Sequence, residues 1–303
     1  MFALETVLLA IISALVLDMR AHARVENLGG VNIWGYRGPV VNRKGLIEVR
    51  IAIAGGDLAF GWGVAPTETL APFVRQAAAL DLEVSGPGGR IVTAVTAGAM
   101  GLPAAGYAEW LAHLAYLRPD VVCLVLDPPD HSPSANAFLP DRSSLAFRRF
   151  GYSPILPLVL QEKGTLIASP VVRVAGTALA RIDARLAGRT GNPPESPTRA
   201  EYLTAIATAA RSGLQIAPAG VVVVVPVSVG GGPDYSWIAS ELAARFDRER
   251  RVRVVDPGAD RELHDAGLRL DGFYFSSAGH TRVARHVAPA VLQLVQGVGV
   301  DTR

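Results

Sequence analysis

Three short segments, far apart in the sequence, carry the side chains that could do chemistry. These side chains are Asp57, then Asp127, Asp130 and His131, and finally Asp271 and Tyr274. Carboxylates together with a histidine can bind a hard or borderline metal ion and activate water. The structural alternative is that aspartates at strand ends cap the following helix or accept hydrogen bonds from loop amides. Both interpretations stay open at this point, although Cys123, the one cysteine, cannot build a cysteine-rich metal site.

Apolar runs rich in β-branched residues indicate the strands that must position these side chains. The runs are 49–54, 91–96, 121–126, 221–227 and 252–255, and the helix-like segments between and after them are 67–82, 107–117, 200–211, 236–246 and 281–294. Strands that alternate with helices predict a parallel sheet covered on both faces. We therefore expect an α/β fold: a three-layer α/β/α sandwich of the flavodoxin-like kind, with a five-stranded parallel sheet. Such sheets bind ligands at the carboxyl ends of their strands.

A glycine-rich string follows the first expected strand. Residues 55–64 read G-G-D-L-A-F-G-W-G-V. This string resembles the first motif of the SGNH, or G-D-S-L, ester hydrolases, which reads G-D-S-L-T-F-G-W-G-V. Gly56 stands where that family has its aspartate, and Asp57 stands where it has the nucleophilic serine. Residues 32–39, N-I-W-G-Y-R-G-P, are similar to the leader N-x-x-G-[FY]-R-G-P of its exported or anchored members.

Two further motifs follow in the order of that family. Residues 95–101, V-T-A-G-A-M-G, resemble its second motif, in which the glycine at position 98 offers a backbone N–H to the oxyanion. Residues 127–131, D-P-P-D-H, stand where the family has G-x-N-D. The resemblance thus places Pro129 at the oxyanion-hole asparagine and Asp130 at the aspartate that follows it.

The last motif lies near the end of the chain, so that the resemblance covers about residues 32–295. Residues 271–280, D-G-F-Y-F-S-S-A-G-H, are similar to D-G-F-H-L-S-P-A-G-H. Asp271 is retained, and Tyr274 occupies the position of the histidine. The catalytic positions that the resemblance implies are Asp57, Gly98, Pro129, Asp130, Asp271 and Tyr274.

The residues at those positions cannot perform the usual reaction of the family. That reaction needs a hydroxyl nucleophile, an imidazole base and donors aimed at the oxyanion. Asp57 has no hydroxyl, and an attack by its carboxylate would give a high-energy anhydride. Tyr274, with an ordinary pKa of about 10, is a poor base at neutral pH. Pro129 has no donor at all, and losing one oxyanion donor costs about 10²–10³ in rate.

Three functions remain open on these observations. The first is a catalytically degenerate SGNH domain, retained for binding or assembly at the cell envelope, with a small-molecule or glycan ligand or a protein partner. The second is an active hydrolase of glycan or lipid (acetyl) esters that uses a non-standard catalytic set. The third is a chain that works with a partner enzyme, for example one that transfers acyl groups to polysaccharides. We expect neither a resident metal nor a cofactor.

Composition and the N-terminus bear on partners and location. The chain has 303 residues, half of them apolar, and a formal net charge of +2, which is too small for a nucleic-acid footprint. The apolar run at 2–17 is open to three interpretations: a signal peptide, a membrane anchor, or a buried helix. We expect a membrane-anchored or exported protein of the cell envelope, with its orientation open.

The expected organisation has three parts. Residues 1–24 form the signal peptide or membrane anchor, and residues 25–48 form a leader segment. Residues 49–297 form the SGNH hydrolase-like domain, with an insertion rich in proline and serine at about 128–198.

Overall fold

The computed structural model describes residues 2–27, 30–84, 90–131, 155–156, 197–228, 232–270 and 272–297. Asp271 and most of the expected insertion lie outside these residues. The chain divides into two compact units, Met1–Val40 with Ala135–Glu195 and Val41–Ser134 with Ser196–Arg303. The expected division into a signal peptide or anchor, a leader segment and an SGNH hydrolase-like domain stays a prediction.

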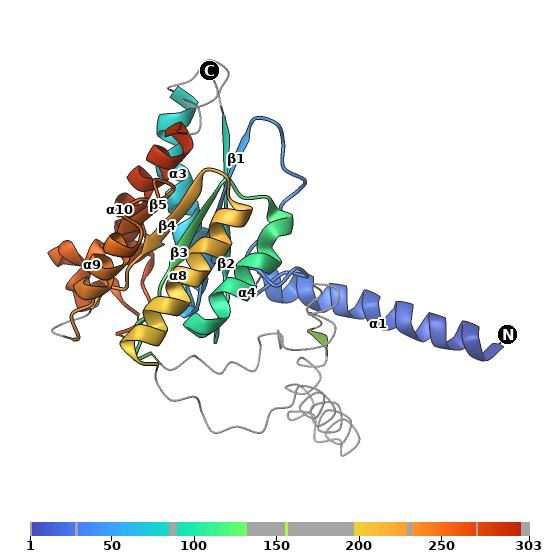
Figure 1. Cartoon of the computed structure of the whole chain (residues 1–303). Helices are drawn as coiled ribbons and strands as arrows, with labels where there is room; N and C mark the ends of the chain where they lie inside the picture. The colour runs from blue at the N-terminus through green and yellow to red at the C-terminus, as the bar shows by residue number, and fades with distance from the viewer. Residues whose placement is uncertain are drawn as a thin grey trace. The chain divides into compact units, whose positions relative to one another are not determined.

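The second unit contains a parallel sheet of five strands (Figure 1). The strands are β1 (Glu48–Gly55), β2 (Ile91–Gly98), β3 (Val121–Val125), β4 (Gly220–Val224) and β5 (Val252–Val255). They lie in the order β2-β1-β3-β4-β5, and every neighbouring pair is parallel. Strands β3 and β4 are buried along their whole length, as expected for valine-rich strands covered on both faces. The predicted α/β/α sandwich is confirmed.

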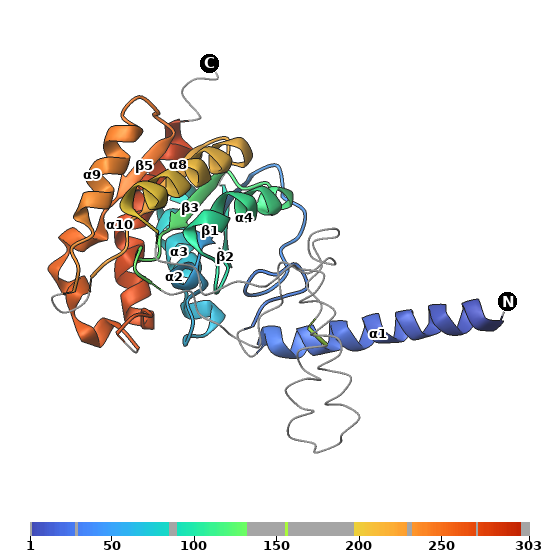
Figure 2. The ribbon, with the colours of Figure 1, turned by 60° about the horizontal axis from the view of Figure 1, so that its bottom comes forward.

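Helices cover both faces of the sheet, as Figures 1 and 2 show. On one face α3 (Leu70–Val84) packs against α10 (Ser277–Gly297), and on the other α4 (Tyr107–His113) packs against α8 (Arg199–Ile216). Helix α9 (Ser236–Arg245) contacts α8 and β5. The core between α3, α10 and the sheet includes alternate residues of β1, Val49, Ile51 and Ile53, because successive side chains of a strand point to opposite faces.

Short helices connect the main elements near the strand ends. They are α2 (Asp57–Phe60), η1 (Pro66–Glu68), η2 (Ala104–Gly106), η3 (Leu114–Leu117), η4 (Pro257–Ala259), η5 (Arg261–His264) and η6 (Ala266–Leu268). The carboxyl ends of β1, β2 and β3 meet at one edge of the sheet, because Gly55 pairs with both Gly98 and Val125. The segments that follow these strands, α2 among them, are therefore brought together there.

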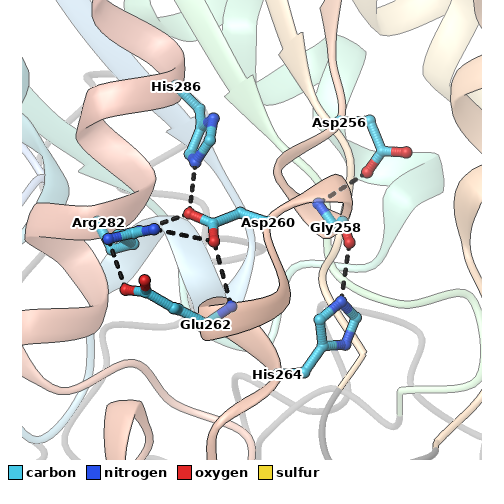
Figure 3. A network of polar contacts seen from close by, with 7 residues as sticks. All are labelled: Asp256, Gly258, Asp260, Glu262, His264, Arg282 and His286. Atoms are coloured by element: carbon cyan, nitrogen blue, oxygen red, sulfur yellow. Dashed lines mark hydrogen bonds and ion pairs between the residues drawn. The ribbon is translucent and has the colours of Figure 1, made fainter.

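A polar network joins η5 to α10 (Figure 3). Asp260 accepts hydrogen bonds from Arg282 Nε at 2.5 Å and Nη2 at 3.0 Å, and its Oδ2 lies 2.9 Å from His286 Nε2. Arg282 Nη1 also lies 2.6 Å from Glu262 Oε2. The side chain of Asp260 caps η5 as well, since it accepts the amide N–H of Glu262. One carboxylate thus fixes η5 on α10.

In the first unit, α1 (Phe2–Asn27) is one continuous helix that runs past the expected boundary at residue 24. Most of its large apolar side chains are exposed, for example Leu4, Leu9 and Met19 at 75%, 66% and 54%. Asp18 is buried, and its Oδ1 accepts the backbone N–H groups of Ile155 and Leu156. Within the described residues, none of the helices combines the length and the hydropathy that crossing a membrane requires.

Candidate functional site

Asp57 opens α2, directly after the carboxyl end of β1. Its side chain is almost fully buried, with 1% of the residue exposed. Oδ1 accepts the backbone N–H of Gly101 at 2.5 Å, and Oδ2 lies 2.9 Å from Nε2 of His131. His131 comes from the segment after β3, so the fold builds an Asp57–His131 pair from two motifs that are 74 residues apart. Both carboxylate oxygens of Asp57 are therefore already engaged.

A second carboxylate, that of Asp127, lies across the amino end of α2. Its Oδ2 accepts the backbone N–H of Asp57 at 2.8 Å, and its Oδ1 accepts that of Leu58, also at 2.8 Å. The hydroxyl of Tyr107 donates to Oδ2 at 3.2 Å, and the hydroxyl of Tyr202 donates to the backbone carbonyl of Asp127 at 2.6 Å. In serine hydrolases, backbone N–H groups at or next to the nucleophile donate to the oxyanion. In this chain they already bind a carboxylate.

Gly56 leaves the room that Asp127 fills. A Cβ atom on Gly56 would lie 1.9 Å from Asp127 Oδ2, far inside van der Waals contact. The SGNH motifs that the sequence resembles have an aspartate at position 56 and a glycine at position 127, so this chain has the two residue types exchanged. The departure at Gly56 is apparent from the first motif alone, whereas the one at Asp127 was not recognised in the sequence. The signal that could have revealed it was the reciprocity of the two changes.

Electrostatics favours an ion pair at this site. Burial raises the pKa of Asp127 to about 6 and the charge of Asp57 adds to the rise, while the amide hydrogen bonds oppose it. For His131, burial disfavours the charged ring, but the hydrogen bond to Asp57 and the charges of Asp127, Asp57 and Asp130 outweigh it. The pKa of His131 is therefore raised, and the imidazolium form is favoured next to the Asp57 carboxylate.

Two of the implied catalytic positions, Gly98 and Tyr274, have packing roles in the structure. Gly98 ends β2, and a Cβ there would lie 2.2 Å from the backbone nitrogen of Phe60 in α2, so that only glycine lets the two approach. Tyr274 is buried and meets Phe273 edge to face. Phe273 in turn stacks on the ring of His131, with centroids 3.9 Å apart. Phe273 therefore contacts both the ring of Tyr274 and the ring of His131.

Pro129 and Asp130, which directly precede His131, also face a second feature of this region. They line a cavity of about 270 Å³ together with Arg199, Tyr235 and Trp237. Asp130 accepts a hydrogen bond from the hydroxyl of Tyr235 at 2.8 Å, and Arg199 lies over the ring of Trp237 at 4.6 Å.

The structure thus joins Asp57 to His131 and Asp127, and it engages Asp130 with Tyr235. Asp271 is outside the described residues. The sequence comparison did not single out Tyr107, Tyr202 or Phe273, because their roles depend on contacts between distant segments. Within the described stretches, no group of three or more potential metal-ligating side chains is arranged to hold a metal ion.

Comparisons with known proteins return similar solved structures only. No family model matches the chain, and no curated protein matches it. A carbohydrate esterase of family 3 from Talaromyces cellulolyticus superposes with a TM-score of 0.46 at 11% identity, over 82% of this chain and 99% of its own.

Two bacterial structures give similar values. A G-D-S-L family protein from Desulfitobacterium hafniense has a TM-score of 0.41 at 12% identity, over 80% of this chain and 99% of its own. A family 3 carbohydrate esterase from Clostridium thermocellum has a TM-score of 0.43 at 11% identity, over 83% and 98%.

The assignment of the fold rests on the chain's own residues. The strand order β2-β1-β3-β4-β5 is that of a flavodoxin-like sheet. The first three motifs follow or end β1, β2 and β3 at its carboxyl edge, as the resemblance to SGNH hydrolases requires. The chain has an SGNH hydrolase-like α/β/α fold.

Proposed function

We propose that this chain does not hydrolyse esters by the SGNH mechanism and that its domain serves binding or assembly at the cell envelope. One observation carries the proposal: the Asp127 carboxylate occupies the backbone N–H groups of Asp57 and Leu58. A developing oxyanion would have to displace a buried carboxylate from those donors. It would also meet the negative charges of Asp57 and Asp127 where catalysis needs positive potential.

The state of Asp57 supports the same conclusion. A nucleophile needs space for the substrate carbonyl, but Asp57 is only 1% exposed, and each of its oxygens already takes part in a hydrogen bond. Removing only the nucleophile from a hydrolase of this kind costs about 10⁶ in rate. The carboxylates of Asp57 and Asp127, the imidazole of His131 and the nearby amides are hydrogen-bonded to one another. Such a closed set of hydrogen bonds is typical of a structural network.

The cavity at Pro129, Asp130, Arg199, Tyr235 and Trp237 is the binding site that fits this proposal. Two aromatic rings with a carboxylate and a guanidinium form a mixed surface that suits a sugar ring or another small polar molecule. We propose a glycan or small-molecule ligand there, with a protein partner as the alternative occupant.

Association with a membrane is the second part of the proposal. Helix α1 exposes apolar side chains over most of its length, a surface that soluble proteins rarely leave uncovered. We propose that α1 attaches the protein to a membrane or serves its export.

A second candidate function, a hydrolase with an unusual catalytic set, is favoured by the Asp57–His131 pair. The side chain of His131 is 18% exposed, and Asp57 holds its Nε2 in the way that an orienting carboxylate holds a catalytic histidine. In the neutral form, Nδ1 could then accept a proton from an attacking water. The raised pKa of His131 counts against this role at neutral pH, because the imidazolium has no lone pair to offer.

An ester-hydrolysis assay separates the two candidates. The purified full-length chain, Asp57→Ala and His131→Gln would be assayed with 4-nitrophenyl acetate and with acetylated polysaccharide. We expect release of product at the rate of the buffer for all three proteins. Turnover by the wild-type chain that both substitutions abolish would overturn the proposal and establish the second candidate.

A further inference from the structure

A basic groove lies at the edge of the sheet opposite to Asp57. It is a cavity of about 600 Å³ at the amino ends of the strands, lined by Arg43, Lys44, Glu48, Arg90, Arg118 and Asp120. The residues come from the loop before β1 and from the segments that lead into β2 and β3. Its volume is that of a site for a small molecule. We call it the amino-edge groove.

Both carboxylates of the groove are committed to its own framework. Asp120 binds Lys44 Nζ through Oδ1 at 2.5 Å and accepts the backbone N–H of Arg50 through Oδ2 at 2.7 Å. Glu48 binds the guanidinium of Arg50 through Oε1 and the backbone N–H of Gly45 through Oε2. Neither carboxylate is left to neutralise another cation.

Three guanidinium groups of the groove have no carboxylate partner. Within the described residues, the side chains of Arg43, Arg90 and Arg118 make neither a hydrogen bond nor an ion pair with another residue. They lie on three different segments, yet all line one cavity. The groove thus combines positive charges that no carboxylate neutralises with a preformed cavity. Arginines on an open, solvated surface lack such a cavity.

The backbone of Arg118 strengthens this interpretation. It has a φ of +50° and is the one residue other than glycine with a positive φ in the described part of the chain. Arg118 ends η3 in the left-handed conformation, where glycine is the residue of lowest cost. An arginine in this backbone conformation is less favourable than a glycine would be. Residues held in such strained conformations cluster at functional positions.

We propose that the amino-edge groove binds a ligand through a phosphoryl group. A carboxylate ligand could form a bidentate ion pair with only one arginine. A phosphoryl group has enough oxygens and charge to bind two or three guanidinium groups at once. Leu46 and Ile47, which are 107% and 55% exposed beside Arg43 and Lys44, offer apolar contact to the rest of the ligand. The phosphoryl group can belong to a free phosphorylated molecule or to a lipid headgroup.

This site is independent of the function proposed above, because it lies at the other edge of the sheet from Asp57. Two substitutions test it. Arg118→Gly removes one charge and also relieves the left-handed backbone, so the midpoint of thermal unfolding should stay equal or rise. Arg43→Gln removes a second charge from an exposed loop. Arg211→Gln, on the exposed side of α8, is the matched control for loss of a surface charge.

The binding experiment has two arms, both with the full-length chain at low ionic strength. In the first, pyrophosphate is titrated into the protein and the heat is measured. In the second, the protein is sedimented with vesicles of phosphatidylcholine alone or of an equimolar mixture with phosphatidylglycerol. We expect each groove substitution to weaken binding by about tenfold or more, the loss typical of one hydrogen bond to a charged group. Arg211→Gln should bind like the wild-type chain.

The two arms identify the source of the phosphoryl group. Saturable binding of pyrophosphate that the groove substitutions weaken indicates a free phosphorylated ligand. A preference for phosphatidylglycerol vesicles that the same substitutions reduce indicates a lipid headgroup. The proposal is overturned if the wild-type chain shows neither, or if Arg118→Gly and Arg43→Gln bind as tightly as the wild-type chain in both arms.

Discussion

At the scale of single residues, Gly56 and Asp127 act as one unit. The carboxylate of Asp127 needs the space beside Gly56, and the amides at the start of α2 need that carboxylate. Buried donors without an acceptor cost about 1–3 kcal/mol each. The consequence is that neither position can change alone without loss of stability.

A double-mutant cycle measures this dependence. Gly56→Asp should lower the free energy of unfolding by about 1–3 kcal/mol, because the new side chain meets Asp127 Oδ2. Gly56→Asp with Asp127→Gly should cost less than the sum of the two single changes, with a coupling of about 1 kcal/mol or more. Urea unfolding monitored by circular dichroism gives these values.

The control for the cycle is Gly297→Ala, where a Cβ meets nothing within 4 Å. It should leave the free energy of unfolding almost unchanged. Additive effects of the two changes at 56 and 127 would contradict the exchange of carboxylates.

The buried charges of the site predict how stability depends on pH. Folding raises the pKa of Asp127 to about 6, so its contribution is lost as pH rises from about 4 through 6. Folding also raises the pKa of His131, so its contribution is present below about 6.5 and is lost as pH rises through the folded value. The free energy of unfolding should therefore fall, by an amount on the order of 3 kcal/mol, between about pH 4 and pH 8.

Urea unfolding at several pH values checks this sign. Asp127→Asn should flatten the acid half of the dependence and His131→Gln the alkaline half. A wild-type chain whose stability increases steadily over the same interval would contradict the assignment of these two groups.

At the scale of secondary-structure elements, one carboxylate holds η5 against α10 (Figure 3). Hydrogen bonds from Arg282 and His286 lower the pKa of Asp260. The contribution of Asp260 to stability is therefore present above pH of about 4 and is lost as the pH falls below it.

Asp260→Asn should lower the midpoint of thermal unfolding at neutral pH, because it weakens three hydrogen bonds between η5 and α10. The difference from the wild-type chain should shrink toward acid pH and at high salt. Glu262→Gln is the control, since the Glu262 side chain is 71% exposed and should contribute little. A difference that persists unchanged at acid pH would show that the charge of Asp260 is not what matters.

Most of the elements could be predicted from the sequence, but their ends could not. The valine run at 221–227 predicted β4, which ends at Val224. The helix expected at 67–82 begins at Leu70, because Pro66–Glu68 forms a separate 3-10 turn. Element type follows from local apolar periodicity, whereas element ends depend on hydrogen bonds with neighbouring segments.

The site was predictable only in part for the same physical reason. Parallel strands bring Asp57, Asp127 and His131 to one edge, and the sequence comparison placed them there. Which carboxylate binds which donor is set by side-chain geometry across segments about 70 residues apart. No local pattern encodes such pairings.

At the scale of the whole molecule, α1 exposes more large apolar side chains than any other described element. Leu8, Leu9 and Ile12 are 57%, 66% and 49% exposed on it. Apolar surface contributes roughly 25 cal/mol per Å² when it leaves water, so a bilayer or micelle should take up this helix.

Replacing Leu8, Leu9 and Ile12 together by Gln should shift the protein from the detergent phase to the aqueous phase in a detergent-partition assay. The free energy of unfolding of the second unit should not change, because none of the three side chains belongs to its core. Unaltered partition of the triple variant would argue against α1 as the attachment segment.

The exchange between positions 56 and 127 also constrains the routes by which such a chain can evolve. An aspartate at both positions forces two carboxylates into one space, and a glycine at both leaves the α2 amides without an acceptor. Every single-step path between the two arrangements thus crosses a less stable intermediate. A chain that has made the exchange is held there by epistasis, and restoring a serine at position 57 alone would not return it to its starting point.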